Sequence, residues 1–111
     1  MQEKFSKATQ EKIQELQLLH QRLQIFNAQR QQLQMQHIEV ENALTELGKT
    51  TGAAYKLVGE ILIEKSTEEL KKELTEKKEE LDLRIKTLEK QEAKTKEQAM
   101  AIQKEVTAEL K

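Results

Sequence analysis

The sequence of 111 residues contains no cysteine, no proline and no tryptophan. Without cysteine, the chain has no disulfide, no thiolate nucleophile and no zinc site of the cysteine type. Aromatic residues are scarce as well, with two Phe and one Tyr, and charge is nearly balanced, with 19 Lys and Arg against 20 Asp and Glu. Nucleic-acid bases usually stack on aromatic side chains within a basic surface. We therefore expect no nucleic-acid partner.

Apolar residues make up 36% of the chain, below the usual share of about 45–50%. No apolar run approaches the roughly 20 consecutive residues of a membrane-spanning helix. The first twelve residues, MQEKFSKATQEK, lack the apolar stretch of a signal peptide. We therefore expect one small cytoplasmic domain that does not enter a membrane and that has too little apolar surface for a conventional core.

The glycines divide the chain into three parts. All three lie within twelve residues near the middle, at Gly48, Gly52 and Gly59. Helix breakers confined to a short centre between two breaker-free arms indicate a helical hairpin, whose arms pair antiparallel. The predicted parts are a first helical arm at 1–47, a centre at 48–65 and a second helical arm at 66–111.

Apolar residues recur along the first arm in alternating steps of three and four. This heptad spacing is the signature of a coiled-coil seam. Arg30 and His37 interrupt the seam, and polar residues at such positions fix register at some cost in stability. The predicted seam positions are Leu16, Leu19, Leu23, Phe26, Arg30, Leu33, His37, Val40, Leu44 and Leu47.

The second arm opens with a capping signal and continues with a second heptad seam. Ser66, followed three residues later by Glu69, forms the pattern of a capping box at a helix start. The remaining positions are rich in Glu and Lys, which suit the solvated face of a coil. The predicted seam positions are Leu74, Lys78, Leu81, Ile85, Leu88, Glu92, Thr95, Ala99, Ile102 and Val106.

The centre changes to a period of two, which indicates strands. We predict strands at 53–57 and 60–65 that form a β-hairpin around Val58 and Gly59. Both faces of this hairpin carry apolar residues, and a lone two-stranded hairpin with unpaired edges is marginal in water. We therefore expect it to join other strands in an oligomeric sheet or barrel. The predicted oligomerisation residues are Tyr55, Leu57, Val58, Gly59, Ile61, Leu62 and Ile63.

Two stretches carry a family resemblance. The string YKLVGEILI at residues 55–63, set between two long helices, resembles the hairpin of β-type subunits of the prefoldin family. The string LRIKTLEKQE at residues 83–92 is similar to the second helix of archaeal β subunits. The resemblance implies a mainly α fold, a long antiparallel two-helix coiled coil whose central β-hairpin joins an oligomeric β-barrel hub.

The resemblance also implies a function. Members of this family are ATP-independent holdases that assemble as hexamers of two α-type and four β-type subunits. The tips of their coiled-coil arms capture unfolded polypeptide and deliver it to a group II chaperonin. These partners are expectations that the resemblance supplies.

The helix ends opposite the hairpin are the predicted client-binding tips. The seam of the first arm weakens before Leu16, where Lys12 and Thr9 replace apolar residues, so apolar groups near the ends should be partly exposed. Exposed apolar groups hold non-native chains without reading their sequence. The alternative is that these residues only close the coil. The candidate residues are Phe5, Ala8, Ile13, Met100, Ile102, Val106 and Leu110.

No pattern indicates an enzyme, a metal site or a cofactor. His20 and His37 are too far apart along one helix to share a metal ion, and Gly-rich phosphate loops and catalytic triads are missing from the sequence. The off-seam residues of the first arm are best explained as packing or interface positions; they are Leu18, Ile25, Met35 and Ile38. A second hypothesis remains open, in which the chain is a structural coiled-coil scaffold that holds no client.

Overall fold

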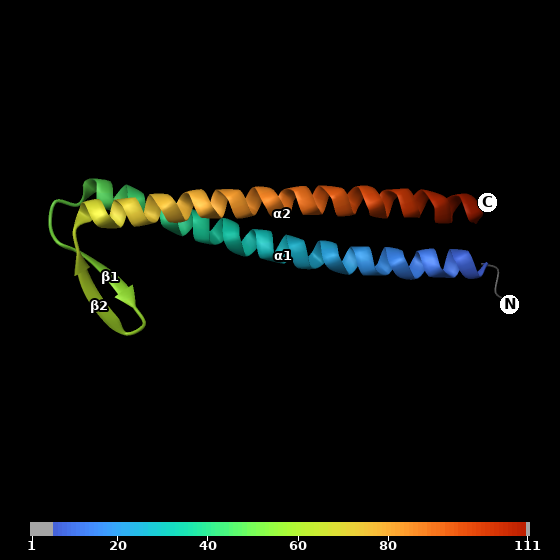
Figure 1. Cartoon of the computed structure of the whole chain (residues 1–111), viewed down its shortest axis with the longest axis horizontal. Coiled ribbons are helices and arrows are strands. Elements are labelled where there is room, and N and C mark those ends of the chain that lie inside the picture. Colours follow the sequence, from blue (N-terminus) through green and yellow to red (C-terminus); the bar gives the residue numbers. More distant parts are fainter. Residues whose placement is uncertain (1–5, 111) are drawn as a thin grey trace. The chain divides into compact units, whose positions relative to one another are not determined.

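The computed structural model describes residues 6–110 as two long helices joined by a β-hairpin (Figure 1). The chain divides into two compact units. The terminal unit consists of Met1–Arg30 and Thr87–Lys111, and the hairpin unit of Gln31–Lys86. The predicted mainly α fold is confirmed. The elements are α1 at Lys7–Lys49, β1 at Ala54–Val58, β2 at Ile61–Lys65 and α2 at Thr67–Glu109.

Both helices begin at a serine cap. The Ser66 hydroxyl accepts a hydrogen bond of 3.1 Å from the Glu69 amide, as the capping signal predicts. The Ser6 hydroxyl accepts one of 3.1 Å from the Thr9 amide, a cap that the sequence pattern did not single out. A serine cap typically stabilises a helix by about 1 kcal/mol, so the caps fix where each helix starts.

Burial follows the two predicted seams. Every predicted seam position of α1 and α2 is buried or half-buried, whereas most other helix positions are exposed. Leu81 in the hairpin unit is fully buried, and Ala99 and Val106 in the terminal unit are 6% and 7% exposed. The heptad spacing therefore predicted which face of each helix packs against the other.

The expected weakening of the seam before Leu16 is wrong at Thr9. Thr9 is 1% exposed, and its hydroxyl lies 2.9 Å from that of Ser6. The hydroxyl pair satisfies the polar groups that burial would otherwise leave unpaired. A short polar residue therefore continues the seam where an apolar one was expected.

Helix α1 runs two residues beyond its predicted end at 47. It passes through Gly48 to Lys49, and the Thr50 side chain donates a 2.8 Å hydrogen bond to the Glu46 carbonyl. Glycine costs about 1 kcal/mol inside a helix but does not end one by itself. The hydrogen bond from Thr50 covers one of the last open carbonyls of the helix.

The hairpin is a two-stranded antiparallel sheet. Val58 pairs with Ile61, so Gly59 and Glu60 form the turn and the predicted turn at Val58 and Gly59 lies one residue too early. Gly59 has a φ of 62°, and no other described residue has a positive φ. A positive φ at the first turn residue alone fits a type II′ turn, which explains why glycine stands first.

Neither helix has a stretch, within the residues searched, that is long and apolar enough to cross a membrane.

Candidate functional site

The hairpin presents two distinct faces, because residues paired across an antiparallel ladder point to the same side. The face that includes Ala54 is turned toward α2, since its lysines contact that helix. The opposite face is largely apolar. The first face holds Ala54, Lys56, Val58, Ile61, Ile63 and Lys65, and the opposite face holds Tyr55, Leu57, Leu62 and Glu64.

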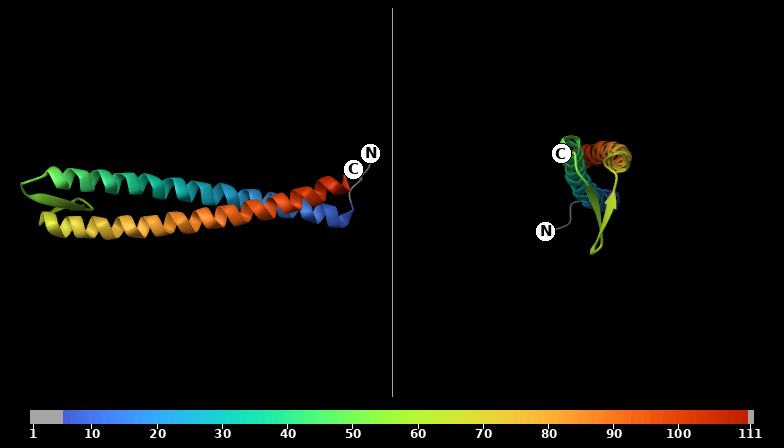
Figure 2. Two further views of the ribbon diagram at one scale, coloured as in Figure 1. Left: turned by 90° about the horizontal axis from the view of Figure 1, so that it is seen from above. Right: turned by 90° about the vertical axis from the view of Figure 1, so that its left-hand side faces the viewer.

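The apolar side chains of the hairpin are exposed. Their exposed fractions run from 42% for Ile63 to 66% for Ile61 and Leu62. Within the described chain, each strand pairs only with the other, which leaves one edge of each strand open. A cluster of exposed apolar groups beside open strand edges marks an interaction surface. The predicted oligomerisation residues thus lie together on one accessible element (Figures 1 and 2).

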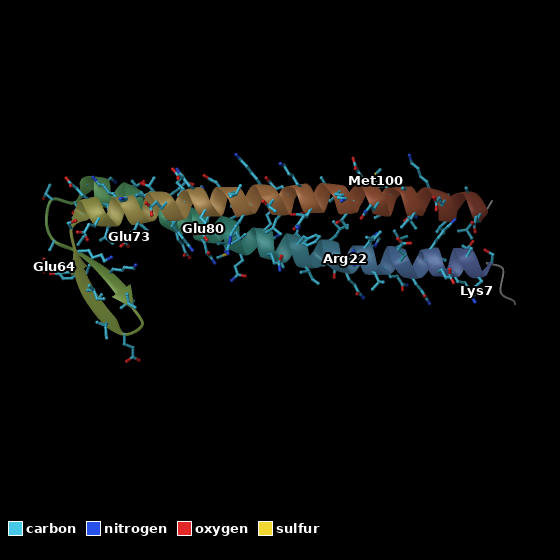
Figure 3. The ribbon with its side chains drawn as sticks, viewed as in Figure 1. Lys7, Arg22, Glu64, Glu73, Glu80 and Met100 are labelled. Atoms are coloured by element: carbon cyan, nitrogen blue, oxygen red, sulfur yellow. The ribbon has the colours of Figure 1, made fainter. Side chains whose placement is uncertain are left out.

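A single carboxylate joins the root of the hairpin to α2. Lys56 of β1 donates a 3.2 Å hydrogen bond to Glu73 Oε2, and Lys65 of β2 donates one to Glu73 Oε1. The hydrogen bond from Lys65, followed by that from Lys56, lowers the pKa of Glu73, and the hydrogen bond that Lys65 donates to Glu73 raises the pKa of Lys65. Figure 3 shows Glu73 near the root of the hairpin. We call these three residues the hairpin clamp.

The predicted client-binding residues divide by burial within the terminal unit. Val106 is 7% exposed and belongs to the seam, and Ile13 and Ile102 are half-buried. Met100 and Leu110 are 61% and 56% exposed. Ala8 is exposed too, and Phe5 lies outside the described residues. The exposed residues, rather than the seam residues, are available to a partner.

Charged residues occupy the seam of the terminal unit as cross-helix pairs. The Arg30 guanidinium donates to both oxygens of Glu92, at 2.5 and 3.3 Å, and the hydrogen bond with Glu92 raises the pKa of Arg30. Lys12 lies 3.3 Å from Glu105 and 3.4 Å from Glu109, whose hydrogen bonds raise its pKa. These pairs link the two helices of the terminal unit at places where the seam has polar rather than apolar residues.

His37 lies between two carboxylates of the hairpin unit. Its Nδ1 is 2.8 Å from Glu41 Oε1, and its Nε2 is 2.7 Å from Asp82 Oδ1 without the alignment of a hydrogen bond. The two carboxylates lie beside different nitrogens of the ring. Over residues 6–110, no three His, Asp or Glu side chains form a group that could hold a metal ion.

Comparison with known proteins identifies the family of this chain. The sequence profile of the family described as "Prefoldin subunit" matches residues 10–111. The chain belongs to the prefoldin family. It is 46% identical over 85 residues to prefoldin subunit beta of Archaeoglobus fulgidus, which covers 75% of this chain and 73% of the relative. It is 32% identical over 108 residues to that of Methanospirillum hungatei, with 96% and 90% covered.

A solved structure agrees with the fold. The crystal structure of the prefoldin beta subunit from Thermococcus strain KS-1 superposes with a TM-score of 0.88 at 28% identity, covering 97% of this chain and 96% of that chain. The predicted resemblance to β-type prefoldin subunits is therefore confirmed. The hairpin thus lies in the same place between two helices as in a solved prefoldin subunit.

Sequence reasoning missed the hairpin clamp in this prefoldin chain. Lys56 and Lys65 were visible as polar members of alternating strands, and Glu73 as one of many charged residues of the second arm. Glu73 lies eight residues after Lys65 and 17 after Lys56. The direction in which the hairpin leaves α2 brings them together, and no local pattern encodes that direction.

Proposed function

We propose that this chain is the β-type subunit of an ATP-independent holdase. In this proposal it assembles through its hairpin with an α-type prefoldin subunit and further copies of itself into an α2β4 hexamer. The ends of its helices bind unfolded polypeptides, which pass to a group II chaperonin. The observation that carries the proposal is the apolar hairpin, whose six large apolar side chains are 42–66% exposed.

The hairpin supports the proposed assembly because its two strands alone form an incomplete sheet. Two strands with no further sheet seldom suffice for stability in water, and open edges pair readily with other strands. Burying the hairpin against neighbouring hairpins removes its apolar surface from water and pairs its open edges. Family membership supports the same assembly, since the chain matches prefoldin subunits over most of its length.

The exposed residues of the terminal unit support client binding. Met100 and Leu110 offer apolar surface that the seam does not use, and methionine adapts to irregular surfaces because its side chain is flexible and polarisable. One such tip binds weakly. Several tips held in one particle act on the same unfolded chain at a high effective concentration, so binding needs neither a sequence motif nor a nucleotide.

The test replaces the two exposed tip residues by serine. We expect the Met100→Ser, Leu110→Ser variant, assembled with its α-type partner, to require a several-fold higher concentration to suppress aggregation of a chemically denatured client. The matched control is Leu83→Ser, which removes a side chain that is 68% exposed on α2 in the hairpin unit. Light scattering during dilution of the client from denaturant measures both variants.

Two results would contradict the proposed capture site. Equal suppression by the double variant and the wild type would move client binding away from Met100 and Leu110. An equal loss in the Leu83→Ser control would show that any exposed apolar residue contributes. Native mass spectrometry of each variant establishes that the assembly itself is unchanged.

A further inference from the structure

We propose that Glu73 is a positioning residue that holds the hairpin in one direction relative to α2, so that the face formed by Tyr55, Leu57 and Leu62 is presented to neighbouring subunits. The role of Glu73 in assembly rests on the proposed function. That Glu73 holds the hairpin is inferred only from contacts within this chain. The inference comes from the contacts at the root of the hairpin, where both strands meet the same carboxylate.

Packing does little to hold the hairpin in place. Of its ten strand residues, only Ala54 is buried, and only Lys65 is half-buried. An open cleft of about 530 Å³ lies along α2 beside the hairpin, lined by Lys56 on the hairpin and by Leu70, Glu73 and Leu74 among the helix residues. Burial therefore holds little of the hairpin, and Lys56 at the edge of this cleft bonds to Glu73 instead.

The connections also permit movement. Ser66 is the single residue between β2 and α2, and residues 50–53 connect α1 to β1. One short link fixes the position of the hairpin root but not the direction of its strands. Lys56 and Lys65 come from different strands of one hairpin face, so two attachments to Glu73 restrict rotation in a way that one attachment cannot.

In the hairpin clamp, one glutamate forms ion pairs with two lysines. The side chains of Lys56, Lys65 and Glu73 are 46%, 26% and 37% exposed. A single ion pair this exposed contributes little, whereas charges in a network contribute more. The glutamate is shared, so its removal breaks both attachments, while the loss of either lysine leaves one in place.

The absence of cysteine makes the test direct, because spin labels can be attached to introduced cysteines alone. Labels at Glu60→Cys in the turn and Glu79→Cys on α2, both exposed positions of the hairpin unit, report the direction of the hairpin. Pulsed electron paramagnetic resonance on the full chain then gives a distance distribution. We expect Glu73→Gln to broaden it, because the amide keeps the shape but loses the charge that both lysines need.

The control is Glu76→Gln, a neutralisation in the same cleft at a residue with no ion pair among those described for residues 6–110. The control should keep the narrow wild-type distribution. Lys56→Met should broaden it less than Glu73→Gln does, because Lys65 still holds Glu73. Circular dichroism confirms that helix content is unchanged in each variant. An unchanged distribution in Glu73→Gln, or equal broadening in Glu76→Gln, would overturn the clamp.

The effect on assembly is measured separately. Mixed with its α-type partner, the Glu73→Gln chain should form the hexamer only at several-fold higher concentration, as measured by native mass spectrometry. If it assembles as the wild type does despite a broadened distribution, the positioning role is wrong. If the wild-type chain forms no hexamer, the proposed function fails, while the distance measurement still decides whether Glu73 holds the hairpin.

Discussion

At the scale of single residues, the informative positions are the polar ones inside the seam. Arg30 and Glu92 interrupt an apolar pattern, and the structure pairs them across the two helices of the terminal unit with 22% and 9% of their side chains exposed. The sequence showed that each interrupts a seam. It did not show that they meet, because 62 residues separate them and their pairing depends on the register of the antiparallel helices.

Breaking this pair on one side should destabilise the coil. We expect Glu92→Leu to lower the midpoint of thermal unfolding, because the half-buried guanidinium of Arg30 loses both bonds to Glu92. The double variant Arg30→Leu, Glu92→Leu should recover the wild-type midpoint or exceed it, since an apolar pair suits the seam of a coiled coil and avoids the cost of burying charge. Circular dichroism during heating measures all three chains.

The control for this pair is Glu97→Leu, at an exposed position of α2. Its midpoint should stay within the error of the wild type. A single Glu92→Leu change that leaves the midpoint unaltered would mean that the pair contributes nothing to stability. A double variant less stable than Glu92→Leu alone would show that an apolar pair does not fit this layer.

At the scale of elements, local patterns predicted a great deal. Alternation of apolar residues placed both strands to within one residue, and every seam position predicted by heptad spacing is buried or half-buried. The errors in predicted boundaries occurred where a single residue determines the local backbone structure. The positive φ of Gly59 moved the turn one residue later, and the Thr50 hydrogen bond extended α1 beyond Gly48. The hairpin clamp was not predicted because it depends on the direction of the hairpin relative to α2.

The clamp should respond to acid in a defined direction. Its lysines lower the pKa of Glu73 below the ordinary value of 4.5. A depressed carboxyl pKa means that the stabilisation is complete above the ordinary value and is lost as pH falls through the lowered one. The distance distribution between labels at positions 60 and 79 should therefore stay narrow from neutral pH to about 4.5 and broaden below it.

The Glu73→Gln chain is the control for the acid transition. It should show the same broad distribution above and below this range, because the titrating group is missing. Wild-type broadening that begins well above the ordinary glutamate pKa would contradict the assignment of the transition to Glu73. Helix content followed at each pH separates release of the hairpin from unfolding of the coil.

At the scale of the whole molecule, each unit carries a surface that the chain itself does not use. The hairpin unit exposes apolar strand residues, and the terminal unit exposes Met100 and Leu110. The first surface joins subunits in our proposal, and the second binds clients. The sequence predicted both regions, but burial was needed to separate exposed tip residues from Val106 and the other seam residues.

The most direct test of this account is native mass spectrometry of the chain, tagged and purified from its own cells. We expect a particle of six chains that contains a second, α-type subunit. The same preparation of a Tyr55→Asp, Leu62→Asp variant should lose that particle and keep its helix content, because the charges lie on the exposed hairpin face. A wild-type monomer or homodimer without a second subunit would contradict the account and favour a coiled-coil scaffold.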